Sequence, residues 1–143
     1  MALIVKNKFP KLEYEIHSTY ECGISLLGWE AKSLRAKNAK LESSFCSISQ
    51  SDELWLNNAY IAQYMLVKGD PLRSRKLLMH RHEIKKLRSL QQRLNLIFIP
   101  LSFYWRGNKI KVEIALAKHL NKHDKREKIK KDEAKKFIKA VLY

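Results

Sequence analysis

The chain has 143 residues and a formal net charge of +15 at neutral pH, and 45% of its residues are hydrophobic. This length fits one domain with a tail, and two cysteines are too few for a disulfide framework. The apolar stretch 94–105 is far shorter than the ~20 residues of a membrane-spanning helix, and Ala2–Val5 is shorter than a signal-peptide core. We therefore expect a cytoplasmic protein in which Cys22 and Cys46 are buried thiols.

The excess positive charge comes from two stretches of the chain. Residues 1–67 hold seven basic and seven acidic side chains, and residues 94–105 hold none of either kind. Residues 68–93 carry nine basic and two acidic side chains, and residues 106–143 carry thirteen and five. Clustered Lys and Arg release counterions from phosphates, so this distribution favours a nucleic acid partner over a merely solubilising surface.

The first half of the chain predicts short strands interrupted by one helix. Turn-prone pairs, Ser18-Thr19 and Ser51-Asp52, separate stretches of strand length. After Gly28, the residues Ala31 and Leu34 lie three apart, which favours one face of a short helix. The expected strands are 14–18, 23–27, 45–49, 53–57 and 60–66, and the expected helix is 29–36.

The second half contains the clearest helix and the clearest strand. Over 80–94, the side chains of Ile84, Leu87 and Leu94 trace one apolar face of a helix. A long apolar strand over 96–105 and a turn at 106–108 are expected next. Over 109–116, apolar and polar residues alternate, which indicates a half-buried strand. About six strands with embedded short helices predict a mainly β fold that closes, or nearly closes, into a small barrel.

A tail is expected after Lys118, where the composition changes. Residues 119–136 have almost no large apolar side chains and cannot bury enough surface to order themselves. Further on, five apolar residues recur at helical spacing, namely Ala134, Phe137, Ile138, Val141 and Leu142. We expect this tail to be disordered or to fold as a helix against a partner, and a helix already docked on the domain is the alternative.

Catalytic and metal-binding patterns are weak. The glycines are scattered at 23, 28, 69 and 107, so no phosphate-cradling loop is present. On a helix, His80 and His82 would point about 200° apart, which makes them poor joint metal ligands. Neither cysteine is close in sequence to a histidine that would activate it, although a pair formed in space stays open. We expect no enzyme, no metal and no cofactor.

Two features fit a nucleic acid surface. Aromatic residues 103–105 precede Arg106, and Trp29 precedes Glu30, so these rings are candidates for stacking on bases. Most are expected in the core, with no more than one or two exposed. In the turn 70–76, Pro71 fixes the backbone and Asp70 can cap it, which would present three cations to phosphates. A solvated loop with an Asp–Arg pair explains this turn equally well.

Several motifs follow one another in a fixed order. Residues 20–35 read YECGISLLGWEAKSLR, residues 70–80 read DPLRSRKLLMH, and residues 123–126 read HDKR. Residues 111–113 and 115–118 read KVE and ALAK, and the pairs Asn7-Lys8 and Glu13-Tyr14 lie near the start. Each motif is weak alone, but together they are specific. The chain resembles the SsrA-binding protein (small protein B, SmpB) family of bacterial trans-translation.

This resemblance implies an architecture and a set of partners. It implies an oligonucleotide-binding (OB) type barrel over 1–118, and a tail over 119–143 that becomes helical in the empty messenger channel of a stalled ribosome. It implies binding to the tRNA-like domain of transfer-messenger RNA (tmRNA). Elongation factor Tu and alanyl-tRNA synthetase are implied as indirect partners through charged tmRNA. We expect the protein to act as a monomer.

The resemblance also places functional residues. RNA contacts fall on Glu21 as a hydrogen-bond acceptor, Leu78 as apolar packing and Lys111 as a phosphate contact. Charge placement adds four further candidates, Lys32, Arg35, Arg73 and Arg75. Contacts of the tail with the ribosome fall on His123, Asp124, Lys125 and Arg126, and an apolar patch falls on Val141 and Leu142.

The chain departs from the family pattern at three places. The family usually has His at the position of Leu12 and Gly at the position of Lys37. Its Gly-Lys-Lys between barrel and tail is replaced by residues 119–121, His-Leu-Asn. A glycine there would supply a hinge, so the replacement bears on how freely the tail swings.

Three other functions are alternatives to an RNA-binding adaptor for ribosome rescue. A structural ribosomal protein is also small, basic and tailed. A basic amphipathic membrane anchor is disfavoured because the tail lacks Trp and its apolar stripe is short. An RNA-processing enzyme is the least favoured, because the sequence contains no acid–base or metal-binding motif.

Overall fold

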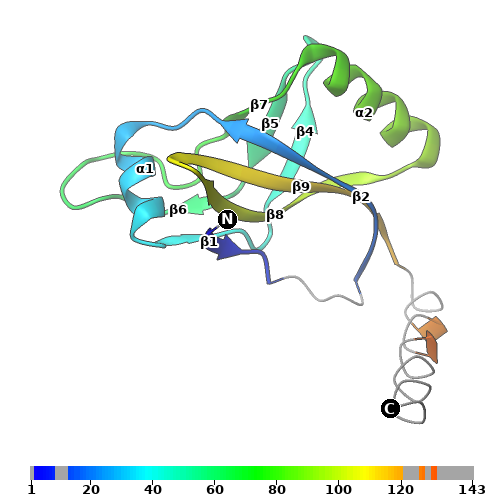
Figure 1. Cartoon of the computed structure of the whole chain (residues 1–143), viewed down its shortest axis with the longest axis horizontal. Coiled ribbons are helices and arrows are strands. Elements are labelled where there is room, and N and C mark those ends of the chain that lie inside the picture. Colours follow the sequence, from blue (N-terminus) through cyan, green and yellow to red (C-terminus); the bar gives the residue numbers. More distant parts are fainter. Residues whose placement is uncertain (1, 9–12, 121–125, 128–129, 132–143) are drawn as a thin grey trace.

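The computed structural model describes residues 2–8, 13–120, 126–127 and 130–131, and shows a mainly β fold with two helices within residues 13–120 (Figure 1). The order is β1 (Ala2–Lys6), β2 (Tyr14–Ile24), α1 (Gly28–Arg35), β3 (Ala39–Lys40), β4 (Phe45–Ile48), β5 (Leu54–Asn57), β6 (Tyr60–Ile61), β7 (Arg75–Leu78), α2 (Arg81–Leu94), β8 (Ile97–Arg106) and β9 (Lys109–His119).

Six of the strands form a closed ring. The sheet order is β1-β8-β4-β5-β7-β2-β9, and β9 also pairs with β8, which closes a ring of the six strands from β8 to β9 in this order. Strand β1 is added outside the ring on β8, and β3 pairs with β6 in a separate small sheet. Because the ring is closed, its strands have few unpaired edges that could pair with other chains. The closed arrangement of about six strands with embedded helices confirms the predicted fold class.

The core fills the interior of the ring and follows the predicted alternation in β9. Val112, Ile114 and Leu116 are fully buried and pack with Phe98 and Phe103 of β8. Full burial of each such side chain contributes about 1.5–3 kcal/mol. Both cysteines are buried free thiols, as expected, and burial raises the pKa of Cys22 to about 12.

Strand β2 is continuous, so the turn expected at Ser18-Thr19 is wrong. It pairs with β9 from Tyr14 to Gly23, and a register shift lies between Ile16 and Ser18. Pairing with β9 from Lys111 to His119 satisfies the backbone groups on the facing sides of both strands, and the irregularity absorbs the extra residue without ending the strand.

The other expected elements are confirmed with shifted limits. The stretch expected as a strand over 60–66 is strand only at Tyr60–Ile61, because the chain turns at Tyr64–Val67, where Met65 has a φ of 52°. Helix α2 confirms the prediction for 80–94 and buries Ile84 and Leu87 in the core. Leu94 was expected on the same face but is 43% exposed, because it is the last helical residue.

Helix α1 ends in a motif that normally favours glycine. The N–H of Lys37 donates to the carbonyl of Leu34, and the N–H of Asn38 donates to that of Ser33. These two bonds form a Schellman motif, in which Lys37 adopts a left-handed φ of 57°. The lysine therefore stands, at some conformational cost, where the family resemblance expects glycine.

The end of β9 holds the first residues of the expected tail. Strand pairing continues through His119, whose ring meets that of Tyr14 edge-on at 5.3 Å between centroids. Leu120 is buried, and its N–H donates to the carbonyl of Glu13 at 2.9 Å. Two of the three residues that replace the Gly-Lys-Lys motif are thus anchored on the ring.

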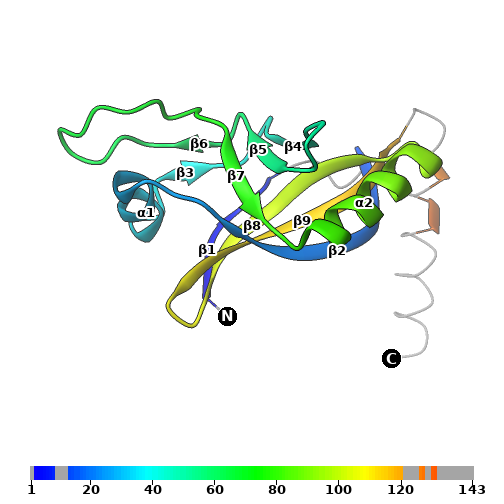
Figure 2. The ribbon, with the colours of Figure 1, turned by 90° about the horizontal axis from the view of Figure 1, so that it is seen from above.

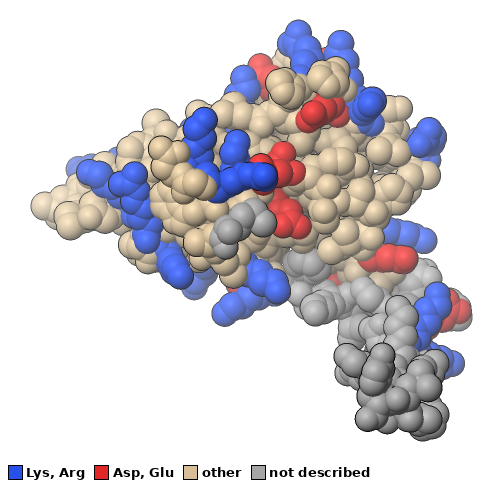
Figure 3. Space-filling model, in the orientation of Figure 1, with Lys and Arg blue, Asp and Glu red and all other residues tan. Residues whose placement is uncertain are grey.

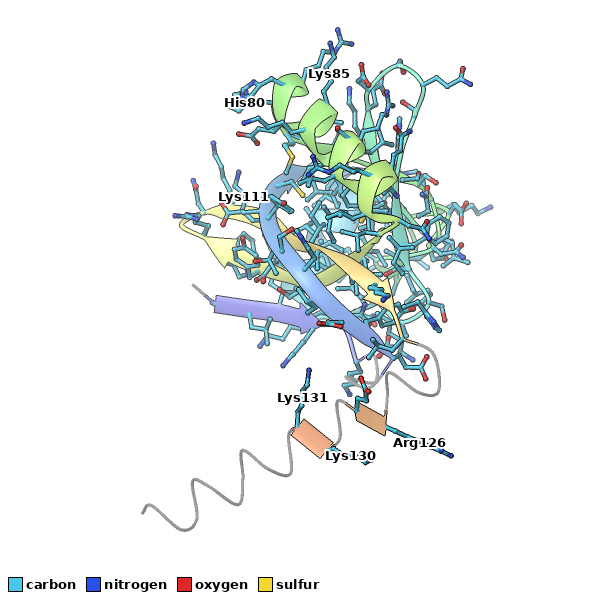
Figure 4. All side chains as sticks on the ribbon, turned by 90° about the vertical axis from the view of Figure 1, so that its right-hand side faces the viewer. His80, Lys85, Lys111, Arg126, Lys130 and Lys131 are labelled. Carbon is cyan, nitrogen blue, oxygen red and sulfur yellow. The ribbon has the colours of Figure 1, made fainter. Side chains whose placement is uncertain are left out.

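Most of the expected tail contacts lie outside the described residues, as does Leu12. This holds for His123, Asp124, Lys125, Val141 and Leu142. Arg126, Lys130 and Lys131 are helical and exposed (Figure 4). No helix in the described part of the chain has the length and apolar content that a bilayer crossing requires.

The two helices lie at opposite ends of the molecule in both views of the ribbon (Figure 2). Basic side chains gather over α1 and, separately, along α2, with acidic side chains between them (Figure 3). The basic surface along α2 comes from the charged stretch 68–93, whereas that over α1 comes from a part of the chain that is neutral overall.

Candidate nucleic-acid interface

Strand pairing brings the three principal RNA-binding candidates together. Gly23 of β2 is paired with Leu78 of β7 on one side and with Lys111 of β9 on the other. Glu21 lies two residues before Gly23 and therefore on the same face of β2. Glu21, Leu78 and Lys111 line one open groove of about 420 Å³. His80 also lines this groove and lies on the same side of α2 as Lys111 (Figure 4).

The absence of a side chain at Gly23 shapes the bottom of this groove. A Cβ atom there would lie 3.2 Å from Cβ of Leu78 and 3.7 Å from Nζ of Lys111. The first distance is too short for easy accommodation, so Leu78 or the backbone would have to move. Gly23 thus lets an apolar side chain and an ammonium group approach each other across β2.

Glu21 is held by two donors from β8. The hydroxyl of Tyr104 and the guanidinium of Arg106 both donate to Oε2 of Glu21, the latter at 2.7 Å. These hydrogen bonds lower the pKa of Glu21, and burial together with the bond to Glu21 raises the pKa of Tyr104. The carboxylate is therefore ionised and fixed in position at neutral pH.

Arg106 is a functional candidate that sequence reasoning missed. Its side chain is 62% exposed while it is paired with Glu21. From the sequence it is expected in a turn directly after the aromatic residues 103–105 but not among the RNA-binding candidates, although Tyr104 and Arg106 share one face of β8 by their spacing of two. A cation two residues after a tyrosine, directly after the predicted strand, could have indicated that Arg106 is oriented by neighbouring side chains.

Arg73 and Arg75 both form ion pairs with Glu30. Arg75 is fully buried, and its Nε lies 2.5 Å from Oε2 of Glu30, which is also fully buried. Nη2 of Arg73 lies 2.5 Å from the other oxygen, Oε1. The expectation that Arg75 contacts phosphate at the surface is therefore wrong in this structure, because no part of it reaches solvent. The side chain of Arg73 is about one-third exposed and forms an ion pair with Glu30.

Hydrogen bonds compensate for the burial of this cluster. Burial raises the pKa of Glu30, but bonds from Arg73, the Leu27 N–H and Arg75 outweigh that effect and hold it below its usual range. Arg75 also donates to the carbonyls of Ala59 and Pro71. The sequence signal was Glu30 itself, which shares the buried face of α1 with Ser33 and Leu34 and so required a cation.

The turn 70–76 serves to attach a loop to α1. Oδ1 of Asp70 accepts a hydrogen bond from the N–H of Leu72, as the capping prediction expected. Trp29 packs on the backbone of Gly69, where a Cβ atom would lie only 2.4 Å from Cζ2 of the indole. The close packing requires glycine at this position.

Lys32 and Arg35 belong to a second basic surface on α1. Nζ of Lys32 lies 5.6 Å from the ring centroid of Tyr64, and the guanidinium of Arg35 lies 6.0 Å from that of Trp105. Both side chains are exposed on α1. The aromatic stacking candidates are not exposed: Trp29, Phe103 and Tyr104 are buried, and Trp105 is half-buried against the core.

The histidine pair differs from its expected geometry. The rings of His80 and His82 stack at 5.6 Å with an interplanar angle of 17°, so the prediction that they point apart is wrong. The reason is that His80 has an extended backbone and precedes α2, so helical spacing does not apply to it. Among the described residues, no group of three or more His, Cys, Asp or Glu side chains is placed to hold a metal ion.

The closed ring, the oriented polar cluster on its outer surface and the cationic helices define a small basic β protein suited to a polyanion. The family model described as SmpB protein matches residues 4–142. The chain belongs to the SmpB family.

Curated relatives match over nearly the whole chain. The SsrA-binding protein of Mycoplasmopsis pulmonis is 47% identical over 141 residues, which cover 98% of this chain and 97% of that protein. The SsrA-binding protein of Aquifex aeolicus is 44% identical over 139 residues, covering 94% and 88%. A solved structure described as "tmRNA-SmpB: a journey to the center of the bacterial ribosome" matches with a TM-score of 0.70 and 36% identity. It covers 90% of this chain and 95% of that chain.

Proposed function

We propose that this chain binds the tRNA-like domain of tmRNA and delivers it to stalled ribosomes as an adaptor of trans-translation. The main support for this proposal is that one groove is lined by Glu21, Leu78 and Lys111, in a chain that matches the family model over residues 4–142. The names of the relatives, which describe binding to SsrA RNA, and the tmRNA-SmpB structure support the same partner. The activity is binding and delivery, without a catalytic step.

The groove offers three kinds of contact to RNA. Lys111 supplies a cation for a phosphate, and Leu78, which is 51% exposed, supplies apolar surface for a ribose or base. Glu21 accepts hydrogen bonds and orients Arg106 at the rim. Lys32 and Arg35 on α1 add a second cationic surface for the RNA backbone. Arg73 and Arg75 are left out, because they hold Glu30.

The tail carries the ribosomal part of the proposal. His123, Asp124, Lys125 and Arg126 contact ribosomal RNA near the decoding centre, and Val141 and Leu142 form the apolar patch of a helix in the empty messenger channel. Elongation factor Tu and alanyl-tRNA synthetase act on the same complex through the charged tmRNA. This role places the protein, as a monomer, in the cytoplasm.

One binding assay tests the RNA partner. The full chain is titrated against the tRNA-like domain of tmRNA, ordinary tRNA and an unrelated duplex over a series of salt concentrations. We expect clear preference for the tRNA-like domain at every salt concentration, with affinity falling as salt rises. Equal affinity for the unrelated duplex would refute the proposal.

A truncation tests the division of labour between ring and tail. The cut belongs after Leu120, because this residue is buried and its N–H is bonded to Glu13. The shortened chain should keep its affinity for the tRNA-like domain and lose tagging of stalled nascent chains. Equal loss of both activities would contradict the proposed roles. A full-length chain found in stoichiometric amounts on all ribosomes would instead indicate a structural ribosomal protein.

A further inference from the structure

A second groove continues from the first, between β2 and α2. It has a volume of about 360 Å³, and Glu21, Met79 and Glu83 line both grooves. The remaining lining residues of the second groove are Tyr20 from β2 and Lys86, Leu87 and Leu90 from α2. One depression therefore runs from Lys111 on β9 along the side of α2.

The floor of the second groove is apolar. Leu87 is 3% exposed and belongs to the core, and Tyr20, Met79 and Leu90 are half-buried against that core. Such a floor accepts a flat ring, because apolar side chains on both sides remove its faces from water. The floor is fixed in place, since its residues come from a strand and a helix that the core holds together.

The rim of the groove is polar and asymmetric. Glu83 and Lys86 lie three residues apart on the face of α2 that carries Leu87 and Leu90. Glu83 is exposed, and within the described part of the chain no side chain donates a hydrogen bond to its carboxylate. Lys85 projects outward from α2, away from Lys111 (Figure 4), and does not line the groove.

We propose that this groove is a subsite for one unpaired guanosine of the bound RNA. The inference rests on the proposed function, because the groove is continuous with the one that holds Glu21, Leu78 and Lys111. The Glu83 carboxylate accepts hydrogen bonds from the base, and Lys86 pairs with a phosphate of the same strand. The RNA backbone thus follows the lysines while the base enters between α2 and β2.

The carboxylate selects guanine among the four bases. An ionised carboxylate only accepts hydrogen bonds, through two oxygens. Guanine carries two adjacent donors on its Watson–Crick edge, N1–H and the N2 amino group. Adenine and cytosine place an acceptor nitrogen next to their single amino group, and uracil places carbonyl oxygens on both sides of its one N–H. Only guanine therefore meets both carboxylate oxygens without bringing an acceptor against one of them.

Two neighbouring lysines provide a matched test of the phosphate contact. Lys85→Ala and Lys86→Ala remove the same charge from the same helix, but only Lys86 lines the groove. We expect Lys86→Ala to weaken binding to the tRNA-like domain about fivefold more than Lys85→Ala does. The dependence of log affinity on log salt concentration should be less steep in Lys86→Ala than in Lys85→Ala, by about one in slope. Equal losses in the two variants would overturn the proposal, because they would show only general electrostatic attraction.

Chemical probing tests the base. Kethoxal reacts with the N1 and N2 atoms of unpaired guanosines, so a base in the groove is protected. We expect the full chain to protect at least one unpaired guanosine of the tRNA-like domain, and Glu83→Gln to lose this protection and about tenfold in affinity. Lys85→Ala should keep the protection. The proposal fails if no guanosine is protected, or if Glu83→Gln protects it as the unchanged protein does.

The methyl group of Met79 lies on the floor of the second groove and also lines the first, so only an unshifted resonance is decisive. Its resonance in the full chain should shift when the tRNA-like domain is added, and an unshifted resonance in the complex would overturn the subsite. A circular dichroism spectrum confirms that Glu83→Gln is folded, as expected for an exposed residue. If the unchanged protein does not prefer the tRNA-like domain over other RNAs, the proposed function itself fails. If it does prefer this RNA but protects no guanosine, only the subsite fails.

Discussion

Two clusters in this protein are built from the same groups and differ in exposure. In one, Glu30 pairs with Arg73 and Arg75, and the side chains of Glu30 and Arg75 are fully buried. In the other, Glu21 pairs with Arg106, and the two side chains are 32% and 62% exposed. Both carboxylates have lowered pKa values because donors hold the charged form.

The difference in exposure assigns the two clusters to different tasks. A buried charge that loses its partner stays unpaired in a medium of low polarity, so the fold depends on the whole cluster. An exposed pair contributes little to stability because water and salt screen it, and its groups remain available to a ligand. The Glu30 cluster therefore attaches the loop and β7 to α1, and the Glu21 cluster is the one that we propose for RNA binding.

The largest expected effect separates the two clusters by stability. Glu30→Gln should lower the free energy of unfolding by about 3–5 kcal/mol, because it leaves Arg75 buried without its counter-charge. Glu21→Gln, the matched exposed change, should leave the free energy of unfolding nearly unchanged. Chemical denaturation of both variants measures this difference. Similar losses would show that burial does not distinguish the clusters.

The pH dependence of stability should also reflect the buried Glu30 cluster. The pKa of Glu30 is lower in the folded protein than in the unfolded chain, so its stabilisation is present above the unfolded value and is lost as pH falls through the folded value. The free energy of unfolding should therefore decrease below roughly pH 4. In Glu30→Gln this decrease should be less steep. Denaturation curves between neutral and acid pH provide the test, and equal slopes would contradict it.

RNA binding should show the reverse pattern. Lys111→Ala should weaken binding to the tRNA-like domain and reduce the salt slope by about one, because one phosphate contact is lost. Thermal unfolding should be nearly unchanged. Lys76→Ala is a suitable control, since Lys76 is a partly exposed cation on β7 that does not line the Glu21 groove. Equal effects of the two changes on binding would argue against a specific role for the groove.

A smaller effect is expected within the exposed cluster. If Glu21 acts partly by orienting Arg106, then Arg106→Ala and Glu21→Ala should weaken RNA binding by less together than the sum of their separate effects. A double-mutant cycle with the tRNA-like domain measures this coupling. Strict additivity would show that Glu21 meets the RNA independently of Arg106.

The smallest change concerns the end of α1, beyond the buried cluster. Lys37→Gly should raise the free energy of unfolding by about 0.5–1 kcal/mol, because glycine adopts the left-handed conformation without steric cost. RNA binding should be nearly unaffected. A thermal melt of this variant beside Lys40→Gly, at an exposed position in β3, tests whether the gain is specific to the motif.

Local pattern was sufficient for much of the fold. The alternation in β9 and the apolar face of α2 follow from the periods of strand and helix, which any chain segment carries in itself. The order of the motifs was likewise readable, and it pointed to the family that the comparisons show. Where local pattern was weak, as at Ser18-Thr19, pairing with β9 decided the structure.

The roles of the arginines were beyond local pattern. Arg73, Arg75 and Arg106 are all cations at or beside predicted turns, and nothing adjacent to them in sequence tells a buried pair from an exposed one. Their partners are distant: Arg75 meets Glu30 across 45 residues, and Arg106 meets Glu21 across 85. Composition and periodicity settle which segments form strands, helices and basic surfaces, because those preferences act between near neighbours. Which charge is neutralised inside and which is presented to a partner depends on how the ring closes, since only closure sets the distance to the counter-charge and the access of water.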